Sequence, residues 1–358
     1  MSKTLTICGG GNLGHVVAAF AAQRGYRVQL LTRHPEQWSH DITIDTPEGI
    51  ALTGHIDRIT NHAEDVIPNA DIVLLCMPGY GIADCLQQIA PLLLHTPKPL
   101  PVGSVVSSTG FFFKALQTLP PTTPLFGFQR VPFIARTEEY GRSAHLLGYK
   151  PQLSMAYVEE REKQDAVSDK ELFRTTIEHL FNTHVELLGS HFEASLTNSN
   201  PLLHTSRLYS MWHTWHEGVT YATQSRFYAD WTDEASQLLI DMDSEFFRLL
   251  AVLPVRPGSI PTVLDYYEST DAASLTRKLH SIQAFQDILS PMKKVGDAYV
   301  PDFQSRYFTE DFPYGLAIVR RLMQAHHIDA PHVEKVYQWG QGFVNPRFPS
   351  WESAVPDL

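Results

Sequence analysis

Two distant segments of the chain carry the residue types that proton transfer and carboxylate binding need. The first, residues 200–204 (NPLLH), has the form of a helix start, with Asn200 as the cap and Pro201 at the first helical position. His204 follows one turn later, and histidine is the side chain used most often as a general acid or base. His204 is thus a candidate catalytic residue. The alternatives are that Asn200 is only a cap and that His204 is only a packed helix residue.

The second segment, residues 306–313 (RYFTEDFP), places an arginine and two acids just ahead of another predicted helix. In one interpretation, Thr309, Glu310 and Asp311 only cap that helix and favour its dipole. In the other, Arg306 binds a substrate carboxylate by a two-pronged contact while one acid orients the histidine. Spacing in the sequence does not choose between the two.

A glycine-rich loop, residues 9–14 (GGGNLG), follows an apolar strand-like run and opens a helical pattern. This is the context that a dinucleotide-binding fingerprint requires. We expect Gly9 to allow the tight turn, Gly11 the approach of backbone to pyrophosphate, and Gly14 the close packing of helix on strand. The amides of Asn12 and Leu13 lie at the helix start, which favours bound negative charge. The alternative is a glycine-rich turn without a ligand.

The end of the second predicted strand bears on which dinucleotide binds. The run at 26–31 ends in Thr32 and Arg33 and lacks the acidic residue that would hold a free ribose 2′-hydroxyl. NADP is therefore favoured over NAD, with Arg33 pairing with the 2′-phosphate and Thr32 adding a hydroxyl donor. In the alternative interpretation, Arg33 is a solvated side chain that only stacks on adenine.

A third strand-like run, residues 70–76, leads into Met77 and Pro78. Ligands of open α/β sheets bind at the carboxyl ends of the strands, so we expect Met77 and Pro78 to line the cofactor cleft. A purely structural turn is the alternative at this position.

Trp212 begins a segment, residues 212–216 (WHTWH), on a long predicted helix. Its two histidines lack a third ligand at convincing spacing, so no metal site is expected. We expect the tryptophans to pack in the interior, with Trp212 also bordering the pocket for an amino substrate.

Composition and charge restrict the class of protein. A chain of 358 residues with a formal net charge of −11 and no Lys/Arg cluster is long enough for two domains and lacks the footprint of a nucleic-acid-binding protein. Three cysteines without a CxxC pair suit a reducing compartment. The start lacks a signal-peptide pattern, and no apolar run approaches the about 20 residues that span a bilayer. These features predict a cytoplasmic protein with small-molecule partners.

The pattern of secondary structure changes near Leu188. Before it, strands and helices alternate, which predicts a mainly parallel sheet covered by helices on both faces, with a hairpin inserted at 41–52. After it, long helical patterns dominate. We therefore expect an α/β Rossmann domain at 1–188 followed by an all-α domain at 189–358. The helices expected in the second domain are 201–228, 233–253, 274–289, 313–326 and 331–343.

Four segments together resemble the octopine and nopaline dehydrogenases, also called opine dehydrogenases. They are residues 9–33, 70–78, 198–209 and 306–323, in the order and spacing of that family, and the likeness covers nearly the whole chain. The NP-x-x-H and RY-x-TED-x-P-x-G patterns are far more specific than the glycine loop. A threonine at 205, where a second proline is common after the histidine, departs from the family pattern and leaves the amino-substrate pocket open.

The resemblance implies a reductive condensation of an α-keto acid with an amino acid or amine, dependent on NADP or NAD. It also implies a Rossmann domain, a helical domain, and a substrate site between them, with a homodimer possible. His204 and Asp311 would form the acid/base dyad, and Arg306 the anchor for the keto-acid carboxylate. Asn200 and Trp212 are expected to border the substrate.

Two rival functions remain. A ketopantoate reductase would share the NADPH loop and the helical second domain, but that family uses a lysine at the start of the second domain, where residues 192–196 read FEASL. A cofactor-binding sensor that has lost its chemistry is the other rival, and the joint presence of His204, Arg306 and Asp311 argues against it.

Overall fold

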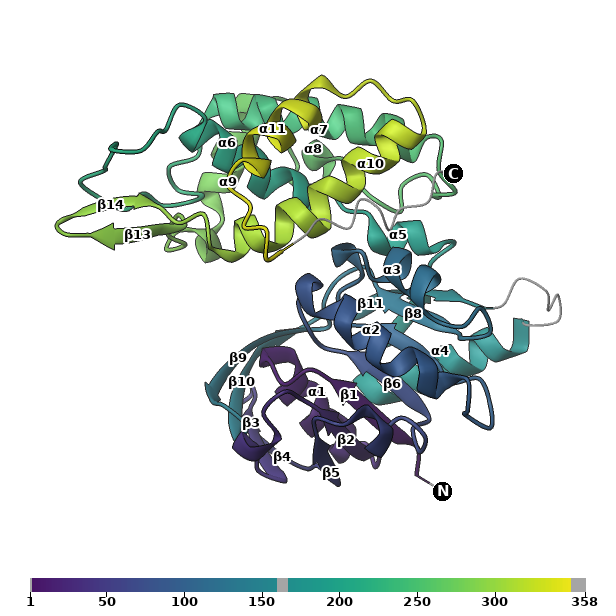
Figure 1. Ribbon diagram of the computed structural model, residues 1–358. Coiled ribbons are helices and arrows are strands. Elements are labelled where there is room, and N and C mark those ends of the chain that lie inside the picture. Colours follow the sequence, from purple (N-terminus) through teal and green to yellow (C-terminus); the bar gives the residue numbers. More distant parts are fainter. Residues whose placement is uncertain (1, 160–166, 349–358) are drawn as a thin grey trace. The chain divides into compact units, whose positions relative to one another are not determined.

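The computed structural model describes residues 2–159 and 167–348, and the chain forms two compact units, Met1–Ser195 and Leu196–Leu358 (Figure 1). The division follows Ser195 rather than the expected Leu188. The short helix α5 (His191–Ser195) belongs to the first unit, because the ring of Phe192 lies 5.8 Å from that of Phe113. No helix in these two described stretches has the length and apolar character needed to cross a membrane.

The first unit is built on an eight-stranded sheet in the order β12-β11-β8-β7-β6-β1-β2-β5, parallel except that β11 runs antiparallel to β8. This confirms the predicted Rossmann-like, mainly parallel sheet. The strands are β1 (Thr4–Cys8), β2 (Arg27–Leu31), β5 (Arg58–Thr60), β6 (Ile72–Leu75), β7 (Val102–Ser104), β8 (Leu125–Phe128), β11 (Gln152–Val158) and β12 (His184–Leu187).

Helices cover both faces of this sheet. The connection from β1 to β2 and the connections from β6 through β7 to β8 run in opposite directions along the sheet. Right-handed crossovers therefore place the first helix on one face and the next two on the other. The last helix packs beside the first. The four helices are α1 (Asn12–Gln23), α2 (Gly79–Leu93), α3 (Phe111–Thr118) and α4 (Val167–Phe181).

A second, four-stranded sheet in the order β4-β3-β10-β9 covers the outer side of α1. The predicted hairpin is confirmed as β3 (Asp41–Asp45) paired antiparallel with β4 (Ala51–His55). The partners β9 (Phe133–Glu139) and β10 (Ser143–Tyr149) were not predicted. Helix α1 fits between two sheets because it presents alanines, and a Cβ added at Gly54 would lie 2.6 Å from the Cα of Ala19.

The second unit is helical, as predicted, with one small β-hairpin made of β13 (Met292–Val295) and β14 (Ala298–Pro301). Two of its segments, η4 (Ser199–His204) and η6 (Tyr307–Leu316), are wound as π-helix. Its α-helices are α6 (Thr205–Trp212), α7 (Asp233–Leu250), α8 (Val263–Tyr266), α9 (Ala272–Ser281), α10 (Ala317–Ala325) and α11 (Pro331–Gln341).

The helix predicted at 201–228 was wrong beyond Trp212, where α6 ends. The chain then turns, with Gly218 at φ 96°, and forms an isolated bridge between Tyr221 and Tyr299 of the hairpin. A positive φ costs glycine little, so Gly218 allows a turn after the helix has ended, and the apolar periodicity of this stretch did not reveal it. The helix predicted at 274–289 likewise ends early, at Ser281.

Candidate active site

A cavity of about 480 Å³ lies at the carboxyl ends of β1, β2 and β6. Between β1 and β6 the strand order reverses, since the chain continues from β1 toward β2 on one side and from β6 toward β7 on the other. Such a reversal point is where open α/β sheets bind ligands. The lining includes most of the residues predicted to hold a cofactor: Gly9, Gly11, Thr32, Arg33, Met77 and Pro78. The sequence-based prediction therefore converges on one cavity within the first unit.

The three glycines of the loop differ in what their missing side chains allow. Gly9 has φ 114°, and a Cβ added to it would lie 2.7 Å from the carbonyl oxygen of Cys76. A Cβ at Gly14 would lie 2.2 Å from the carbonyl oxygen of Gly9. A Cβ at Gly11 would have nothing within 4 Å. The packing of the protein explains Gly9 and Gly14, whereas the free space at Gly11 fits an approaching ligand backbone or phosphate.

The start of α1 is suited to an anion. Gly11 stands in the capping position without a side-chain hydrogen bond, and the first turn carries no acid. The Oδ1 of Asn12 is already engaged, since it accepts from the amide of Thr137 at 3.0 Å and from its hydroxyl at 2.7 Å. Leu13 packs partly against the core. The backbone amides of these two residues and the side-chain NH₂ of Asn12 are donors that can serve a diphosphate.

His15 braces the glycine loop and was missed by the sequence analysis. The amide of Gly141, in the β9–β10 turn, donates to its Nε2 at 2.8 Å, so its Nδ1 carries the proton and donates to the carbonyl oxygen of Gly11 at 2.9 Å. Burial lowers the pKa of His15. The ring also packs against Trp38, with the centroids 4.2 Å apart and the planes tilted by 32°. The neutral imidazole thereby joins the cofactor loop to the four-stranded sheet.

In the second unit, His204 and Asp311 form a close pair. Nδ1 of the imidazole lies 2.8 Å from Oδ2 of the carboxylate, and each side chain is 15% exposed. A carboxylate accepts at this distance, so the proton of the neutral ring sits on Nδ1 and the lone pair on Nε2. These two residues are 107 positions apart, and the fold alone brings them together.

The pair rests on the two π-helical segments, His204 at the end of η4 and Asp311 within η6. Such segments are uncommon and occur frequently at functional sites. The wider winding also accommodates Pro313, which has no amide proton to donate. The segments approach closely at Gly315, where an added Cβ would lie 2.9 Å from Cγ of Pro201.

Tyr228, which the sequence analysis did not select, contacts the other nitrogen of the imidazole. Its hydroxyl lies 3.2 Å from Nε2 of His204, and its side chain is buried. The ring of Tyr307 packs against His204 edge to face at 4.8 Å. The false prediction of a helix through residue 228 obscured this contact, because it placed Tyr228 several turns away from His204.

Comparisons with known proteins show what the two halves of the chain are similar to. The family model described as NAD/NADP octopine/nopaline dehydrogenase, alpha-helical domain, matches residues 187–344, and that of ketopantoate reductase PanE/ApbA matches residues 5–98. The tauropine dehydrogenase of Arabella iricolor is 25% identical over 374 residues, which cover 96% of this chain and 92% of the relative.

Two solved structures share the fold. An octopine dehydrogenase with NADH and L-arginine aligns with a TM-score of 0.84 and 22% identity, over 100% of this chain and 94% of that one. A yersinopine dehydrogenase with NADP⁺ bound aligns with a TM-score of 0.71 and 13% identity, over 98% of this chain and 94% of that one.

Residues 187–344 match the helical domain of the octopine/nopaline dehydrogenase family, and the octopine dehydrogenase of Mizuhopecten yessoensis is 26% identical over 95% of this chain. The chain is an oxidoreductase that depends on a nicotinamide dinucleotide, like the octopine and tauropine dehydrogenases that it matches along nearly its whole length. The cavity of the first unit fits that cofactor, because a Cβ at Gly11 would occupy space that the protein itself leaves open.

The other residues predicted from the sequence lie as follows. Arg306 immediately precedes η6 and is exposed, and no ion pair within the described chain engages it. Glu310 is buried beside the dyad acid in sequence, yet it is Asp311 that pairs with His204. Asn200 is exposed and is not the cap, because η4 begins at Ser199 after Asn198. Trp212 is only 1% exposed and packs on Phe303, so it lies in the interior.

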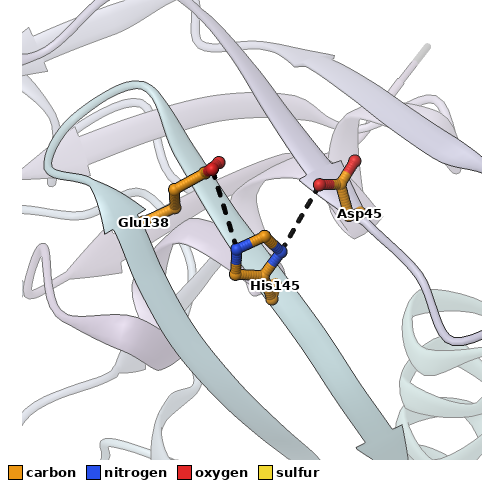
Figure 2. A group of neighbouring side chains, drawn as sticks. All are labelled: Asp45, Glu138 and His145. Atoms are coloured by element: carbon orange, nitrogen blue, oxygen red, sulfur yellow. Dashed lines mark ion pairs between the residues drawn. The ribbon is translucent and has the colours of Figure 1, made fainter.

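One further cluster of ionisable side chains lies on the outer face of the four-stranded sheet. Figure 2 shows His145 with a carboxylate toward each ring nitrogen, Asp45 at 3.4 Å from Nδ1 and Glu138 at 3.8 Å from Nε2. The three side chains are between 40% and 58% exposed. A protonated imidazole satisfies both acids without a metal ion, and exposed pairs of this kind contribute little to stability.

Proposed function

We propose that this chain catalyses the reductive condensation with His204 and Asp311 as its acid/base dyad, Arg306 as its keto-acid anchor, and NADPH as its preferred cofactor. The observation that carries the proposal is the 2.8 Å contact between Nδ1 of His204 and Oδ2 of Asp311 in a partly buried site. A histidine and an acid so arranged form a proton-transfer unit, in which the acid fixes the tautomer of the base.

The first unit would hold the cofactor. The loop at 9–14 and the start of α1 would bind the diphosphate, with Met77 and Pro78 lining the nearby wall. Arg33 supports NADPH, because it lines the cavity, is exposed, and has no ion-pair partner in the described chain. The cofactor supplies a hydride to the carbon of the imine formed by the two substrates.

Arg306 would bind the keto acid through its carboxylate. A guanidinium presents a planar fork of donors that matches a carboxylate, and this one is exposed at the beginning of the segment that carries Asp311. Because Arg306 is the residue that caps η6 and Asp311 lies within it, the same segment would position the anchored substrate and the dyad acid.

His204 would move the proton. With Nδ1 directed to Asp311, Nε2 is the atom that can accept a proton from the secondary amine in the oxidative direction or return one in the reductive direction. Asp311 would stabilise the imidazolium that forms in the oxidative direction. General acid/base help of this kind contributes about 10² to 10⁴-fold to the rate.

The test is NADPH oxidation by the purified full chain in a matrix of α-keto acids against amino acids and amines, each also supplied alone. Oxidation that requires both partners, and that is lost in His204→Ala while NADPH still binds, is the expected result. Turnover of ketopantoate without an amine would indicate a ketopantoate reductase. Tight NADPH binding without turnover anywhere would indicate a sensor.

A further inference from the structure

We propose that Tyr228 is a positioning residue. Its hydroxyl donates a hydrogen bond to Nε2 of His204 between turnovers, which fixes the orientation of the imidazole, and it releases this hydrogen bond when the substrate binds. This inference rests on the proposed role of His204 as the acid/base. It assigns a function to a side chain in a segment that lies outside the regular helices of the second unit.

The imidazole of His204 is held at both ends. Asp311 takes Nδ1 at 2.8 Å, and the hydroxyl of Tyr228 lies 3.2 Å from Nε2. A histidine ring can rotate about its χ2 bond, so a partner at one nitrogen alone leaves the direction of the other loosely defined. Two partners fix the plane of the ring and the direction of the Nε2 lone pair.

The direction of the hydrogen bond follows from the neighbours. The proton of the neutral ring lies on Nδ1, so Nε2 accepts and the tyrosine hydroxyl donates. Burial, together with the nearby phenols of Tyr307 and Tyr267 and the carboxylate of Asp311, raises the pKa of Tyr228 far above its ordinary value. The hydroxyl therefore keeps its proton through the working pH range.

Packing fixes the position of Tyr228. Its ring stacks on Phe285 with centroids 4.1 Å apart and an interplanar angle of 18°, and it lies nearly parallel to Trp231 at 6.0 Å. Because the ring of Tyr228 is buried between aromatic neighbours, it has little freedom to rotate, and its hydroxyl oxygen stays close to Nε2. Rotation about the C–O bond can turn the hydroxyl proton away from Nε2 and free its lone pair, while the ring and the oxygen stay in place.

A buried arginine secures the backbone on both sides of Tyr228. Arg207 of α6 donates from Nε to the carbonyl oxygen of Phe227 at 3.0 Å and from Nη2 to that of Asp230 at 2.6 Å. Burial lowers the pKa of this guanidinium to about 10, which still leaves it charged at neutral pH. A charged group held in the interior to bind two carbonyls gives an otherwise irregular segment a defined shape.

The experiment compares the wild-type protein with Tyr228→Phe, which keeps the stacked ring and removes only the hydroxyl. We expect kcat to fall by about tenfold, the value of one hydrogen bond to an active group, with little change in the KM of the keto acid or in NADPH binding. Tyr337→Phe is the matched control, because Tyr337 is a buried tyrosine of the same unit, packed against Arg320. Its kcat should stay at the wild-type value.

A second measurement does not depend on turnover. In ¹⁵N-histidine-labelled protein, the His204 signals, assigned by their absence from His204→Ala, should show the Nδ1–H tautomer with a hydrogen-bonded Nε2, and Tyr228→Phe should shift the Nε2 signal alone. Unchanged kcat together with an unchanged Nε2 signal would overturn the proposal for Tyr228 and leave His204 as the base. An active His204→Ala would instead overturn the proposed function. If the variant does not fold, a proton on Nε2 in the wild-type spectrum overturns the proposal.

Discussion

Pro201 and Gly315 meet across the two π-helical segments, and a Cβ at Gly315 would come within 2.9 Å of the proline Cγ. This contact lies between the elements that carry His204 and Asp311. The absence of a side chain at Gly315 therefore sets how close the base and its acid can approach. We expect Gly315→Ala to force the segments apart at an overpacking cost of about 1–3 kcal/mol and to lower turnover as well as stability. A melting curve and kcat measured on one preparation check both effects.

The dyad predicts which acid matters. Asp311→Asn should lower kcat by about 10² to 10⁴-fold, close to the effect of His204→Ala, because an amide can turn its NH₂ toward Nδ1 and impose the wrong tautomer. Glu310→Gln should lose less than about tenfold, since it is the neighbouring acid that contacts the imidazole. Steady-state kinetics of the three variants rank their losses in kcat. A larger loss in Glu310→Gln than in Asp311→Asn would mean that Glu310 is the acid of the dyad.

The guanidinium of Arg306 should act on one substrate. We expect Arg306→Ala to raise the KM of the keto acid by about 10- to 100-fold, as for the loss of a charge-assisted contact, without changing the KM of NADPH. Arg306→Lys should recover only part of this, because an ammonium lacks the planar fork. Arg226→Ala is the control, since Arg226 is a half-exposed arginine of the same unit. Equal effects of the two alanine variants would argue against an anchor.

Cofactor preference should depend on Arg33. The wild-type chain is expected to have a lower KM for NADPH than for NADH, and Arg33→Gln should raise the former by about 10- to 100-fold while leaving the latter nearly unchanged. The measurement is the ratio of the two kcat/KM values in both proteins. An equal or reversed preference in the wild type would remove the assignment of Arg33 to a 2′-phosphate.

The glycines of the loop should separate binding from folding. Gly11→Val fills space that no protein atom occupies, so its melting temperature should stay close to that of the wild type while dinucleotide binding is lost. Gly14→Ala forces a methyl group toward the carbonyl oxygen of Gly9 and should destabilise the fold by about 1–3 kcal/mol. Calorimetric titration with NADPH and thermal melting distinguish the two. A Gly11→Val protein that binds normally would contradict the placement of the diphosphate.

His15 should make the first unit sensitive to acid. Burial lowers its pKa from 6.5, so below that pH the unfolded chain takes up a proton that the folded chain refuses. The stability that the neutral form provides is thus complete above pH 6.5 and falls as the pH drops toward the lowered folded value. We expect the decrease in melting temperature between pH 8 and pH 5.5 to be smaller in His15→Gln than in the wild type. Equal decreases would show that other groups account for the acid sensitivity.

Local sequence determined a large part of this protein. The strand-loop-helix context of residues 9–14, the apolar runs and the alternation of elements led to the Rossmann-like sheet and to the loop that lines its cavity. These features are readable because each depends on neighbouring residues, through helix and strand periodicity and the backbone freedom of glycine. His204, Arg306 and Asp311 were selected from local motifs together with a family likeness.

Only the tertiary structure decided which of these side chains meet. Nothing in spacing alone chose Asp311 over Glu310 as the partner of His204, because that depends on which side of a π-wound segment faces the histidine. Tyr228 could not be found from the sequence, since apolar periodicity extended the helix past Trp212 and hid the turn at Gly218. The role of His15 as a link between the glycine loop and the four-stranded sheet also depends on a distant contact, because the amide of Gly141 in the β9–β10 turn donates to its Nε2. Contacts between residues that are far apart in the chain are set by packing, and the local periodicity of the sequence does not predict them.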